Sequence, residues 1–539
     1  MIPLSTTIAA ILSLFFLTIT PLSLSSSSSL DDSLTYIWPL PANFTSGNLT
    51  LTVDPDLSIS YSGNSMIISD AFLRYKRLIF IHASKVSRKF RSIRGPAYDI
   101  SVLQIIVHSS DEELQFGVDE SYSLKVSGRD DQSIVGVATI EANTVYGALR
   151  ALETFSQLCT FDYGSKSVKI FKAPYYIQDE PTFAYRGLLV DTSRHYLPIA
   201  VIKQIIDSMS YAKLNVLHWH IVDEQSFPLE TPSFPNLWKG SYSRWERYTV
   251  EDAYEVVNFA KARGIHVMPE IDVPGHAESW GVGYPDLWPS LSCKEPLDVS
   301  KNFTFDVVSG ILTDLRKIFP FELFHLGGDE VNTGCWNSTA HIKQWLLDHN
   351  MTSKDAYQYF VLRAQEIAIS NNRTPVNWEE TFISFPSKMN PRTIVHNWLV
   401  SGICPKAVAK GFRCIFSNQD AWYLDHLDVP WEPVYNADPL EGITNTTQQK
   451  LILGGQVCMW GETADTSNIQ QTIWPRAAAA AERLWSRREA TTGGNINITA
   501  LPRLHYFRCL LNLRGVQAAP VTNFYARRAP IGPGSCYEQ

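Results

Sequence analysis

The sequence predicts an α/β protein in which a (β/α)8 TIM barrel follows a smaller α+β domain. Three observations lead to this prediction. Eight short apolar runs of strand type recur between residues 174 and 520, and most of them precede a segment with helical periodicity. Polar or aromatic residues stand where these runs end, as they do at the carboxyl end of a barrel. The length of 539 residues exceeds one ordinary core and leaves room for a second domain.

The first residues are predicted to be a targeting segment rather than part of the folded protein. Residues 8–19 are apolar, too short a run to span a membrane, and Pro21 and a serine tract follow. We therefore assign residues 1–25 to a cleavable signal peptide and expect no membrane anchor. Asn-x-Ser/Thr sequons support a glycosylated protein of the secretory pathway, in a vacuole, a lysosome or the extracellular space. The acceptor residues are Asn43, Asn48, Asn302, Asn337, Asn350, Asn372, Asn445 and Asn497.

The smaller domain is predicted over residues 30–173 and mixes strand patterns with one helix. Strand character appears at 101–108, 122–126 and 133–140. Asn143 is predicted to cap a helix that carries apolar residues on one face. These residues are Val145, Leu149, Leu152 and Phe155. The domain contains no recognisable catalytic constellation.

The barrel is predicted over residues 174–520. Its eight strand-like runs are 187–190, 215–222, 265–271, 321–326, 375–378, 393–398, 413–416 and 455–460. Pro198 occupies a first-turn position before one helical segment, and Gly264 closes another that begins near Glu251. Such strand and helix alternation is typical of a (β/α)8 barrel, whose catalytic residues come from the ends of several strands.

Composition narrows the kinds of partner. Hydrophobic residues at 45% and charged residues at 19% are globular values. The net charge of -8, without a sustained Lys/Arg run, argues against nucleic acid and anionic membranes. The 15 Trp and 23 Tyr suit sugar-stacking pockets, although core packing explains most of them.

The cysteines favour disulfides over a metal centre, because no C-x-x-C spacing occurs among the eight. We expect Cys293 to pair with Cys335, which would tie the loops around the strand at 321–326. We expect Cys509 to pair with Cys536 and to pin a C-terminal tail, residues 521–539. Cys458 lies in an apolar strand and is expected to be a buried free thiol, while Cys159, Cys404 and Cys414 stay unassigned.

The strongest candidate site is the segment from His325 to Glu330, in which an apolar run breaks at two glycines before Asp329 and Glu330. Glycines allow a tight turn or a close approach, and the two acids stand where a strand opens into its loop. The alternative is a solvated acidic turn. The other strand ends favour a shared site.

Each of these other residues also has a structural interpretation. Arg194 suits the binding of two neighbouring hydroxyl groups, or a simple ion pair at the domain junction. His218 and His220 share a strand face, yet without a third ligand nearby we expect core histidines and no metal. Asp223 and His276 could tune the pKa of a nearby acid or form a plain structural pair. Three indoles at strand ends suit a pyranose ring or a core: Trp378, Trp398 and Trp460.

Five segments in order give the chain a resemblance to glycoside hydrolase family 20 β-N-acetylhexosaminidases of the eukaryotic lysosomal type. They are Tyr185 to Tyr196, Leu217 to Asp223, Asp272 to His276, His325 to Glu330 and Cys458 to Glu462. The resemblance implies exo-acting removal of terminal β-linked GlcNAc or GalNAc from glycans, without a cofactor. It also implies a homodimer and a small α/β domain packed on the barrel.

The resemblance assigns roles in a retaining mechanism in which the 2-acetamido group of the substrate is the nucleophile. Glu330 would be the acid and then the base, Asp329 would orient the acetamido group, and Tyr423 would donate to its carbonyl oxygen. Adjacent residues of an extended strand point to opposite sides, so these two acids fit poorly as a nucleophile and acid pair. Substrate binding would involve Arg194, Asp223, His276, Trp378, Trp398, Trp460 and Glu462.

Two departures from the best-known relatives concern substrate choice. Asp425-His426 stands where relatives that accept 6-sulfated or sialylated substrates resemble Asn-Arg, and the carboxylate of Asp425 should repel anionic groups. The short stretch 290–304 argues against ganglioside cleavage. The alternatives are a catalytically silent sugar-binding protein, a storage glycoprotein, and a hydrolase with a protein nucleophile, for which Glu462 is the first candidate.

Overall fold

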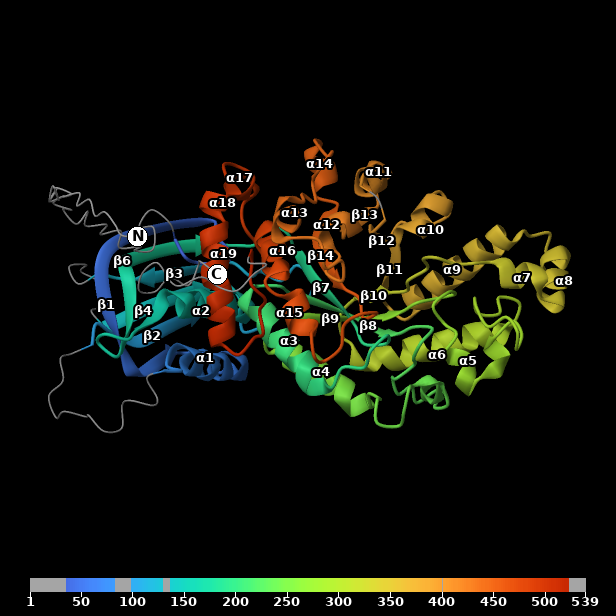
Figure 1. The fold of residues 1–539 in the computed structure, drawn as a ribbon, viewed down its shortest axis with the longest axis horizontal. Coiled ribbons are helices and arrows are strands. Elements are labelled where there is room, and N and C mark those ends of the chain that lie inside the picture. Colours follow the sequence, from blue (N-terminus) through green and yellow to red (C-terminus); the bar gives the residue numbers. More distant parts are fainter. Residues whose placement is uncertain (1–34, 83–97, 129–135, 400, 523–539) are drawn as a thin grey trace, which may run out of the picture.

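The computed structural model describes residues 35–82, 98–128, 136–399 and 401–522 and contains two units (Figure 1). The smaller unit lies at the left of the figure, and the barrel with its long loops lies at the right. The predicted signal peptide, residues 1–25, lies outside the described residues, as does most of the predicted tail. Within the described part of the chain, no helix is long and apolar enough to cross a membrane.

The smaller unit is a mixed six-stranded sheet packed against helices. The strand order is β1-β2-β4-β3-β6-β5, and the long strand β1 pairs with both β2 and β6. Helix α2 packs against α1 and against the sheet. The elements are β1 (Asn43–Tyr61), α1 (Met66–Ile79), β2 (Ile100–Val107), β3 (Tyr122–Val126), β4 (Gly136–Ala142), α2 (Val145–Leu158), β5 (Cys159–Asp162) and β6 (Ser167–Asp179).

The sequence predictions for this unit need two changes. The cap of α2 is Thr144, whose hydroxyl accepts from the Gly147 N–H, whereas the Asn143 side chain donates to Asp119. The prediction of Asn143 as the cap is therefore wrong. Strand β6 stays paired with β3 as far as Asp179, so the expected boundary at 173/174 falls inside this strand.

The larger unit is a closed barrel of eight parallel strands in which β14 pairs with β7. Every predicted strand run overlaps one of these strands, and the fold prediction is confirmed. The strands are β7 (Tyr185–Asp191), β8 (Val216–Val222), β9 (His266–Ile271), β10 (Leu323–His325), β11 (Thr374–Trp378), β12 (Ile394–His396), β13 (Arg413–Phe416) and β14 (Ile452–Met459).

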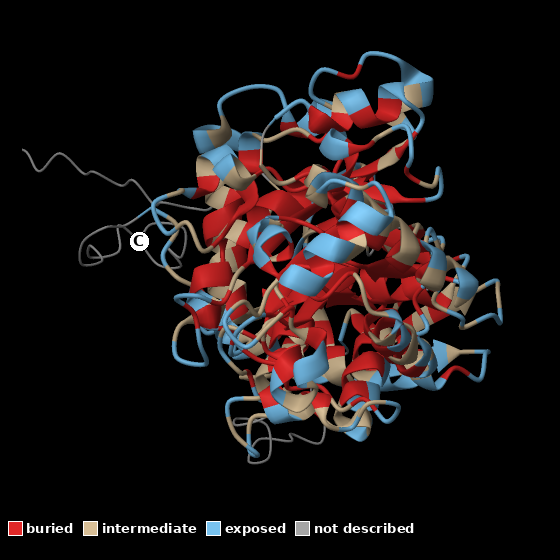
Figure 2. Cartoon of the chain, turned by 90° about the vertical axis from the view of Figure 1, so that its right-hand side faces the viewer, coloured by how far each residue is buried: buried red, intermediate tan, exposed pale blue. Residues whose placement is uncertain are grey.

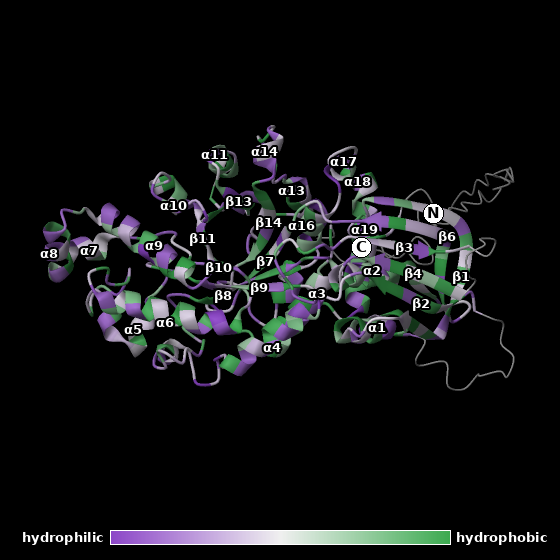
Figure 3. Ribbon diagram, turned by 180° about the vertical axis from the view of Figure 1, so that it is seen from behind, coloured by the Kyte–Doolittle hydropathy of each residue, from purple (hydrophilic) through white to green (hydrophobic). Residues whose placement is uncertain are grey.

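Helices surround the barrel and bury one face against it, so in Figure 2 red buried residues lie inside and pale-blue exposed residues lie on the outward faces of helices and in loops. Hydrophilic and hydrophobic residues alternate along these outer helices in Figure 3. Thr249 and Asp252 form a capping box at the start of α4, and Pro198 is the N-cap of α3.

The α-helices of the barrel unit are α3 (Ile199–Tyr211), α4 (Val250–Lys261), α5 (Trp280–Gly283), α6 (Asn302–Ile318), α7 (Gly334–Ser338), α8 (Ala340–Asp348), α9 (Ser353–Ser370), α10 (Glu379–Ser384), α11 (Ile403–Ala409), α12 (Gln419–Trp422), α13 (Trp431–Asn436), α14 (Thr446–Gln449), α15 (Ile469–Ile473), α16 (Arg476–Trp485), α17 (Arg488–Thr491), α18 (Ile496–Thr499) and α19 (Leu501–Leu513). Two 3-10 helices complete the set, η2 (Leu237–Gly240) and η3 (Pro285–Leu287).

The smaller unit closes the amino end of the barrel through a buried group of charges, the junction cluster, made of Glu120, Arg150, Arg186, Asp179 and Lys213. Glu120 binds Arg150 at 2.7 Å and Arg186 at 2.6 Å. Lys213 binds Asp179 at 2.8 Å. Because Arg186 and Lys213 belong to the barrel and the other three to the smaller unit, these ion pairs hold the two units together.

Disulfides occur at two described places. Cys293 is bonded to Cys335, as predicted, and the bond joins the loop after β9 to α7. Cys404 is bonded to Cys414, a pairing that the sequence left open. Cys509 is also disulfide-bonded, but its predicted partner Cys536 lies outside the described residues. Cys159 and Cys458 are free thiols, and Cys458 is buried as expected.

Candidate active site at the carboxyl end of the barrel

The structure brings the predicted site residues together at the carboxyl end of the barrel, opposite the junction cluster. Each follows or ends a strand: Arg194 after β7, Asp223 after β8, His276 after β9, Asp329 and Glu330 after β10, Trp378 at the end of β11, Trp398 after β12, Tyr423 and Asp425 after β13, and Trp460 and Glu462 after β14. The eight predicted glycosylation sites are all exposed, which suits glycan attachment. They stay predictions.

The turn before the two acids requires its glycines. Gly327 and Gly328 have φ angles of +61° and +97°, which L side chains rarely adopt. A Cβ at Gly327 would lie 1.9 Å from Oδ1 of Asp272. The Gly328 N–H donates to that same oxygen at 2.8 Å. The turn is therefore built directly onto the carboxylate of Asp272.

The two acids occupy different environments. Asp329 is buried, at 8% exposure, whereas the side chain of Glu330 is 59% exposed. Glu330 has a φ of +49°, a left-handed conformation that is common at functional sites and costly elsewhere. Strand β10 ends at His325, so the alternation of an extended strand, assumed from the sequence, does not set the directions of the two side chains. The turn does.

Asp329 has an oxygen available for a ligand. Its Oδ1 is buried without a hydrogen-bond partner among the described residues. Burial and the neighbouring charge of Asp329 raise the pKa of Asp272 well above its usual value.

Glu330 is connected to a buried pair behind it. Nε2 of His276 lies 3.6 Å from Oε2 of Glu330, and Nδ1 of His276 lies 3.1 Å from Oδ1 of Asp223. Burial alone would lower the pKa of His276, but the surrounding carboxylates outweigh burial and raise that pKa. The His276 ring in turn lowers the pKa of Glu330. Asp223 and His276 are thus paired, and the contact of His276 with Glu330 favours the interpretation in which the pair tunes a nearby acid.

Arg194 is held by three carboxylates, one of which is Asp223. Its Nη1 lies 3.0 Å from Asp191, its Nη2 lies 2.9 Å from Asp223, and Glu462 lies 3.7 Å away. The guanidinium also lies over the ring of Trp460, 5.3 Å from its centroid. Arg194 therefore belongs to the site and not to the domain junction, the alternative that its sequence context left open.

Aromatic rings surround the space in front of the acids. Trp398 and Tyr423 are stacked at 6.1 Å, and Trp460 lies 6.1 Å from Tyr423 and 6.0 Å from Trp378. Burial raises the pKa of Tyr423 well above 10, so its hydroxyl stays protonated and can donate. Such walls suit the apolar faces of a sugar ring.

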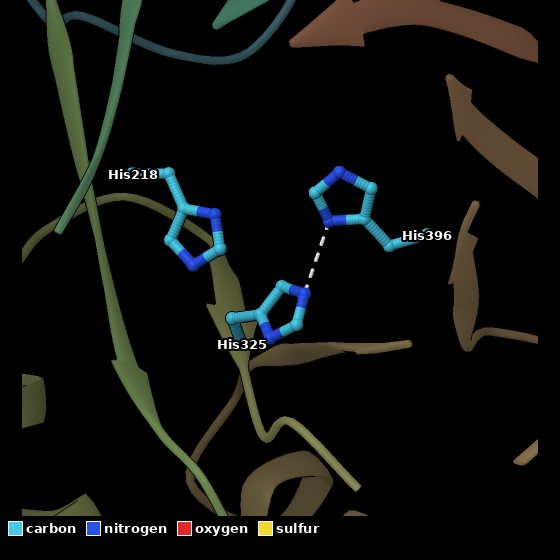
Figure 4. Close-up of side chains that lie close together, drawn as sticks. All are labelled: His218, His325 and His396. Atoms are coloured by element: carbon cyan, nitrogen blue, oxygen red, sulfur yellow. Dashed lines mark hydrogen bonds between the residues drawn. The ribbon is translucent and has the colours of Figure 1, made fainter. Parts of the chain in front are cut away.

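Other residues of the site were not predicted. Nε1 of Trp398 donates to Glu380 at 3.0 Å, and burial with the nearby charge of Asp329 raises the pKa of Glu380 to about 8. Under the pocket, Glu270 contacts His220, and His325 binds His396 (Figure 4). Acids after a strand, such as Glu379-Glu380 behind Trp378, were the signal that could have found Glu380.

The histidine prediction is corrected in one respect. His218 has two further histidines close by, His325 and His396, with one nitrogen of each within 4.8 Å of the others. Figure 4 shows the three rings facing a common space. Each ring nitrogen nevertheless lies within 3.1 Å of a polar atom, among them Gln456, Glu270, Gly327 and Ser417. Most of these contacts form a hydrogen-bonded network in the barrel core, but Nε2 of His218, 2.9 Å from Glu270, has no hydrogen-bond partner among the described residues.

A family model described as the catalytic domain of glycosyl hydrolase family 20 matches residues 183–488. The chain belongs to glycosyl hydrolase family 20. A second model, described as β-acetyl hexosaminidase like, matches residues 37–158. The chain is therefore a glycoside hydrolase whose catalytic domain is the barrel and whose smaller unit is the amino-terminal domain found in this family.

Known relatives are similar along nearly the whole chain. β-Hexosaminidase 1 of Arabidopsis thaliana is 71% identical over 532 residues, which cover 98% of each protein. The β-hexosaminidase subunit beta of Mus musculus is 35% identical and covers 91% of this chain and 92% of its own. Among solved structures, a chitobiase of Flavobacterium johnsoniae has a TM-score of 0.76 at 29% identity, covering 90% of this chain and 73% of its own.

Proposed function

We propose that this glycosidase is an exo-acting β-N-acetylhexosaminidase that removes terminal β-linked GlcNAc or GalNAc. The observation that carries the proposal is that Asp329 and Glu330 lie in different environments, which suit different roles. Asp329 is buried with a free acceptor oxygen, and Glu330 is exposed at the rim beside His276. The names of the similar β-hexosaminidases from Arabidopsis thaliana and Mus musculus agree with this activity.

The proposed reaction is retaining and uses the substrate as nucleophile. A retaining enzyme with a protein nucleophile needs its two carboxyl groups about 5–5.5 Å apart across the bond, and family 20 is among the families that depart from this rule. The acetamido oxygen attacks the anomeric carbon while the bond to the leaving oxygen breaks. Glu330 gives its proton to that oxygen. Water then attacks the same carbon, Glu330 takes a proton back, and the oxazolinium ring opens.

Asp329 and Tyr423 are assigned to the acetamido group. The free Oδ1 of Asp329 accepts from the acetamido N–H, and the negative charge stabilises the oxazolinium as it forms. The protonated Tyr423 hydroxyl donates to the acetamido oxygen and orients it for attack. Arg194, Asp425 and Glu462 take the sugar hydroxyls, and the indoles hold the ring faces. Asp223 supports Glu330 through His276.

Substrate choice is proposed to follow charge. Asp425 is half-buried, and its buried Oδ1 has no hydrogen-bond partner among the described residues. A sugar hydroxyl satisfies this oxygen, whereas a sulfate or sialyl carboxylate meets repulsion in a poorly solvated place. We infer a preference for uncharged N-glycans or chitooligosaccharides, and no ganglioside cleavage, because the stretch 290–304 is short.

The sequence also supports two proposals about the whole protein. The eight exposed sequons suit a glycoprotein of the secretory pathway that functions in a vacuole, a lysosome or outside the cell. A homodimer is proposed from the family resemblance, and analytical ultracentrifugation of the purified protein tests it.

Replacement of Glu330 by Gln tests the function. We expect kcat on a 4-nitrophenyl GlcNAc glycoside to fall about 10²- to 10⁴-fold, because Gln cannot transfer a proton. The fold should be unchanged, since the Glu330 side chain is mostly exposed. A fully active Glu330→Gln enzyme would exclude this residue as the acid. Lack of inhibition by a thiazoline analogue of GlcNAc would instead favour a protein nucleophile such as Glu462.

A further inference from the structure

Glu270 contacts both Trp378, one of the indoles of the site, and His220, which leads to the groups behind Glu330. It lies on β9 and is fully buried, so it does not reach the sugar itself. Its Oε1 accepts from Nε1 of Trp378 at 3.0 Å, and its Oε2 lies 2.6 Å from Nδ1 of His220. One carboxylate thus joins an indole of the pocket to a buried histidine.

His220 continues this connection toward the acid. Its Nε2 lies 2.7 Å from Oδ2 of Asp223, so the ring stands between two buried carboxylates. Burial alone would lower the pKa of His220, but Glu270 and Asp223 raise it to about 10. With a proton on both nitrogens, His220 donates to both carboxylates at once. It therefore fixes the position of Asp223 relative to the barrel core.

Asp223 transmits that position to the catalytic acid. Its other oxygen, Oδ1, lies 3.1 Å from His276, which in turn lies 3.6 Å from Glu330. Nη2 of Arg194 also lies 2.9 Å from Oδ2 of Asp223. A shift of Asp223 would displace His276, whose left-handed backbone, φ +54°, already restricts where its ring can go.

Glu270 also lies close to two of the three histidines drawn in Figure 4, His218 and His325. Nδ1 of His325 lies 2.8 Å from Oε1, and Nε2 of His218 lies 2.9 Å from Oε2. His325 is bound to His396, and His396 to Ser417. These contacts come from three separate strands of the barrel and surround Glu270 with core side chains.

We propose that Glu270, acting through His220 and Asp223, is a positioning residue for the general acid step. The inference rests on the proposed function, in which Glu330 protonates the leaving oxygen. Glu270 does not touch the substrate, and its contribution is to hold His276 where it can place the carboxyl group of Glu330. Loss of this support should therefore harm reactions that need a proton far more than reactions that do not.

The test compares two substrates in Glu270→Gln, which keeps the shape and one acceptor oxygen for Trp378. Chitobiose releases a sugar alcohol and needs protonation, whereas the 2,4-dinitrophenyl glycoside of GlcNAc releases a stable anion. We expect kcat/KM to fall about 10²-fold on chitobiose, the size of loss that a misplaced catalytic group produces. On the dinitrophenyl substrate we expect less than about a threefold fall. Equal losses on both substrates would overturn the proposal, because they indicate a general structural defect.

Glu482→Gln is the matched control, since Glu482 is an equally buried carboxylate bound to Arg503 and has no contact with the site. Its two kcat/KM values should change by the same factor. If Glu270→Gln does not fold, His220→Gln breaks the same connection and must show the same selective loss. In a protein that already carries His276→Ala, adding Glu270→Gln should lower kcat/KM for chitobiose by less than about threefold. Glu270 is proposed to act on Glu330 through His276, and this residue is then missing. A wild-type protein that hydrolyses neither substrate would overturn the proposed function as well.

Discussion

The two ends of the barrel both bury charged groups, and they satisfy them differently. In the junction cluster, Glu120 binds two arginines and Asn215, while Arg186 also donates to two backbone carbonyls. At the carboxyl end, Asp329 and Asp425 each keep a buried oxygen without a partner among the described residues. Buried polar groups without partners are costly, so a fold retains them where a ligand completes them.

The difference teaches where stability and function reside. The junction cluster has nothing left to bind and serves to hold two units together. The site carries incomplete hydrogen bonding, carboxyl groups with raised pKa values and left-handed backbone at His276 and Glu330. These features are typical of functional sites and reduce stability. Variants at the two ends should therefore change different quantities.

The largest expected effect on stability is at the junction. Glu120→Gln leaves two buried arginines without a carboxylate, and breaking a buried ion pair costs about 3–5 kcal/mol. We expect a clear fall in the thermal unfolding temperature, measured by differential scanning fluorimetry, with kcat unchanged in the protein that remains folded. Glu141→Gln is the control, since its pair with His108 is half exposed and its loss should hardly matter. A stable Glu120→Gln protein would remove the distinction between the two ends.

The opposite pattern is expected for Asp329→Asn. The amide removes the charge that stabilises the oxazolinium, so kcat should fall about 10²- to 10³-fold, as on loss of a preorganised electrostatic group. Stability should hold or rise, because a buried carboxylate with a free oxygen is replaced by a neutral group. Kinetics and unfolding temperature measured on one preparation check this. A fall in unfolding temperature comparable with that of Glu120→Gln would contradict the expectation.

The pH dependence of stability should also separate the ends. The pKa of His220 is raised to about 10, so its stabilising contribution is complete below pH 6.5 and is lost as pH rises toward 10. The charges of Arg186 and Arg150 outweigh burial and lower the pKa of Glu120, so its contribution is complete above pH 4.5 and is lost as pH falls through the folded value. Each pH unit within such a window changes stability by up to about 1.4 kcal/mol.

The measurement is the unfolding temperature of wild type minus that of each variant across pH 3 to 10. The difference for His220→Gln should be greatest near pH 6 and should shrink toward pH 10. The difference for Glu120→Gln should shrink only in acid. Two parallel profiles would show that the ends are not electrostatically distinct.

The smallest expected effect concerns specificity. Asp425→Asn keeps a hydrogen-bonding oxygen and removes the negative charge. We therefore expect kcat/KM for a 6-sulfated GlcNAc glycoside to rise about tenfold, which corresponds to part of the repulsion energy between two close negative charges. Turnover of the unsulfated glycoside serves as the reference and should change less. An unchanged ratio of the two substrates would place the selectivity elsewhere.

The sequence predicted the barrel well because its parallel strands are buried on both faces and form continuous apolar runs. Strand β1 was missed because most of its residues are exposed or half-buried and show no apolar run. Strand β6 was missed across the predicted boundary for a similar reason, since exposed residues interrupt it. Apolar content identifies strands of a core, and not strands at a partly solvated sheet.

The site was predictable where residues follow strands directly, as Asp329, Glu330 and His276 do. The contacts between strands were not. His220 meets Glu270 because β8 and β9 align these two residues in register, and no pattern within either segment specifies that alignment. Asp272 meets Asp329 only because the glycine turn folds back over β9. Register and turn geometry are properties of the assembled barrel.

The disulfide between Cys293 and Cys335 has a practical consequence for anyone who produces this protein. The bond joins the loop that contains Cys293 to helix α7, which follows Glu330. In the same loop, Glu295 accepts a hydrogen bond from the N–H of Ala277, the residue after His276. A bond that closes a loop of this length contributes about 4 kcal/mol. Protein made in a reducing bacterial cytosol would lack this disulfide, which lies close in the chain to Glu330 and to the loop that follows His276. An oxidising expression host is therefore the appropriate source for any kinetic comparison of variants.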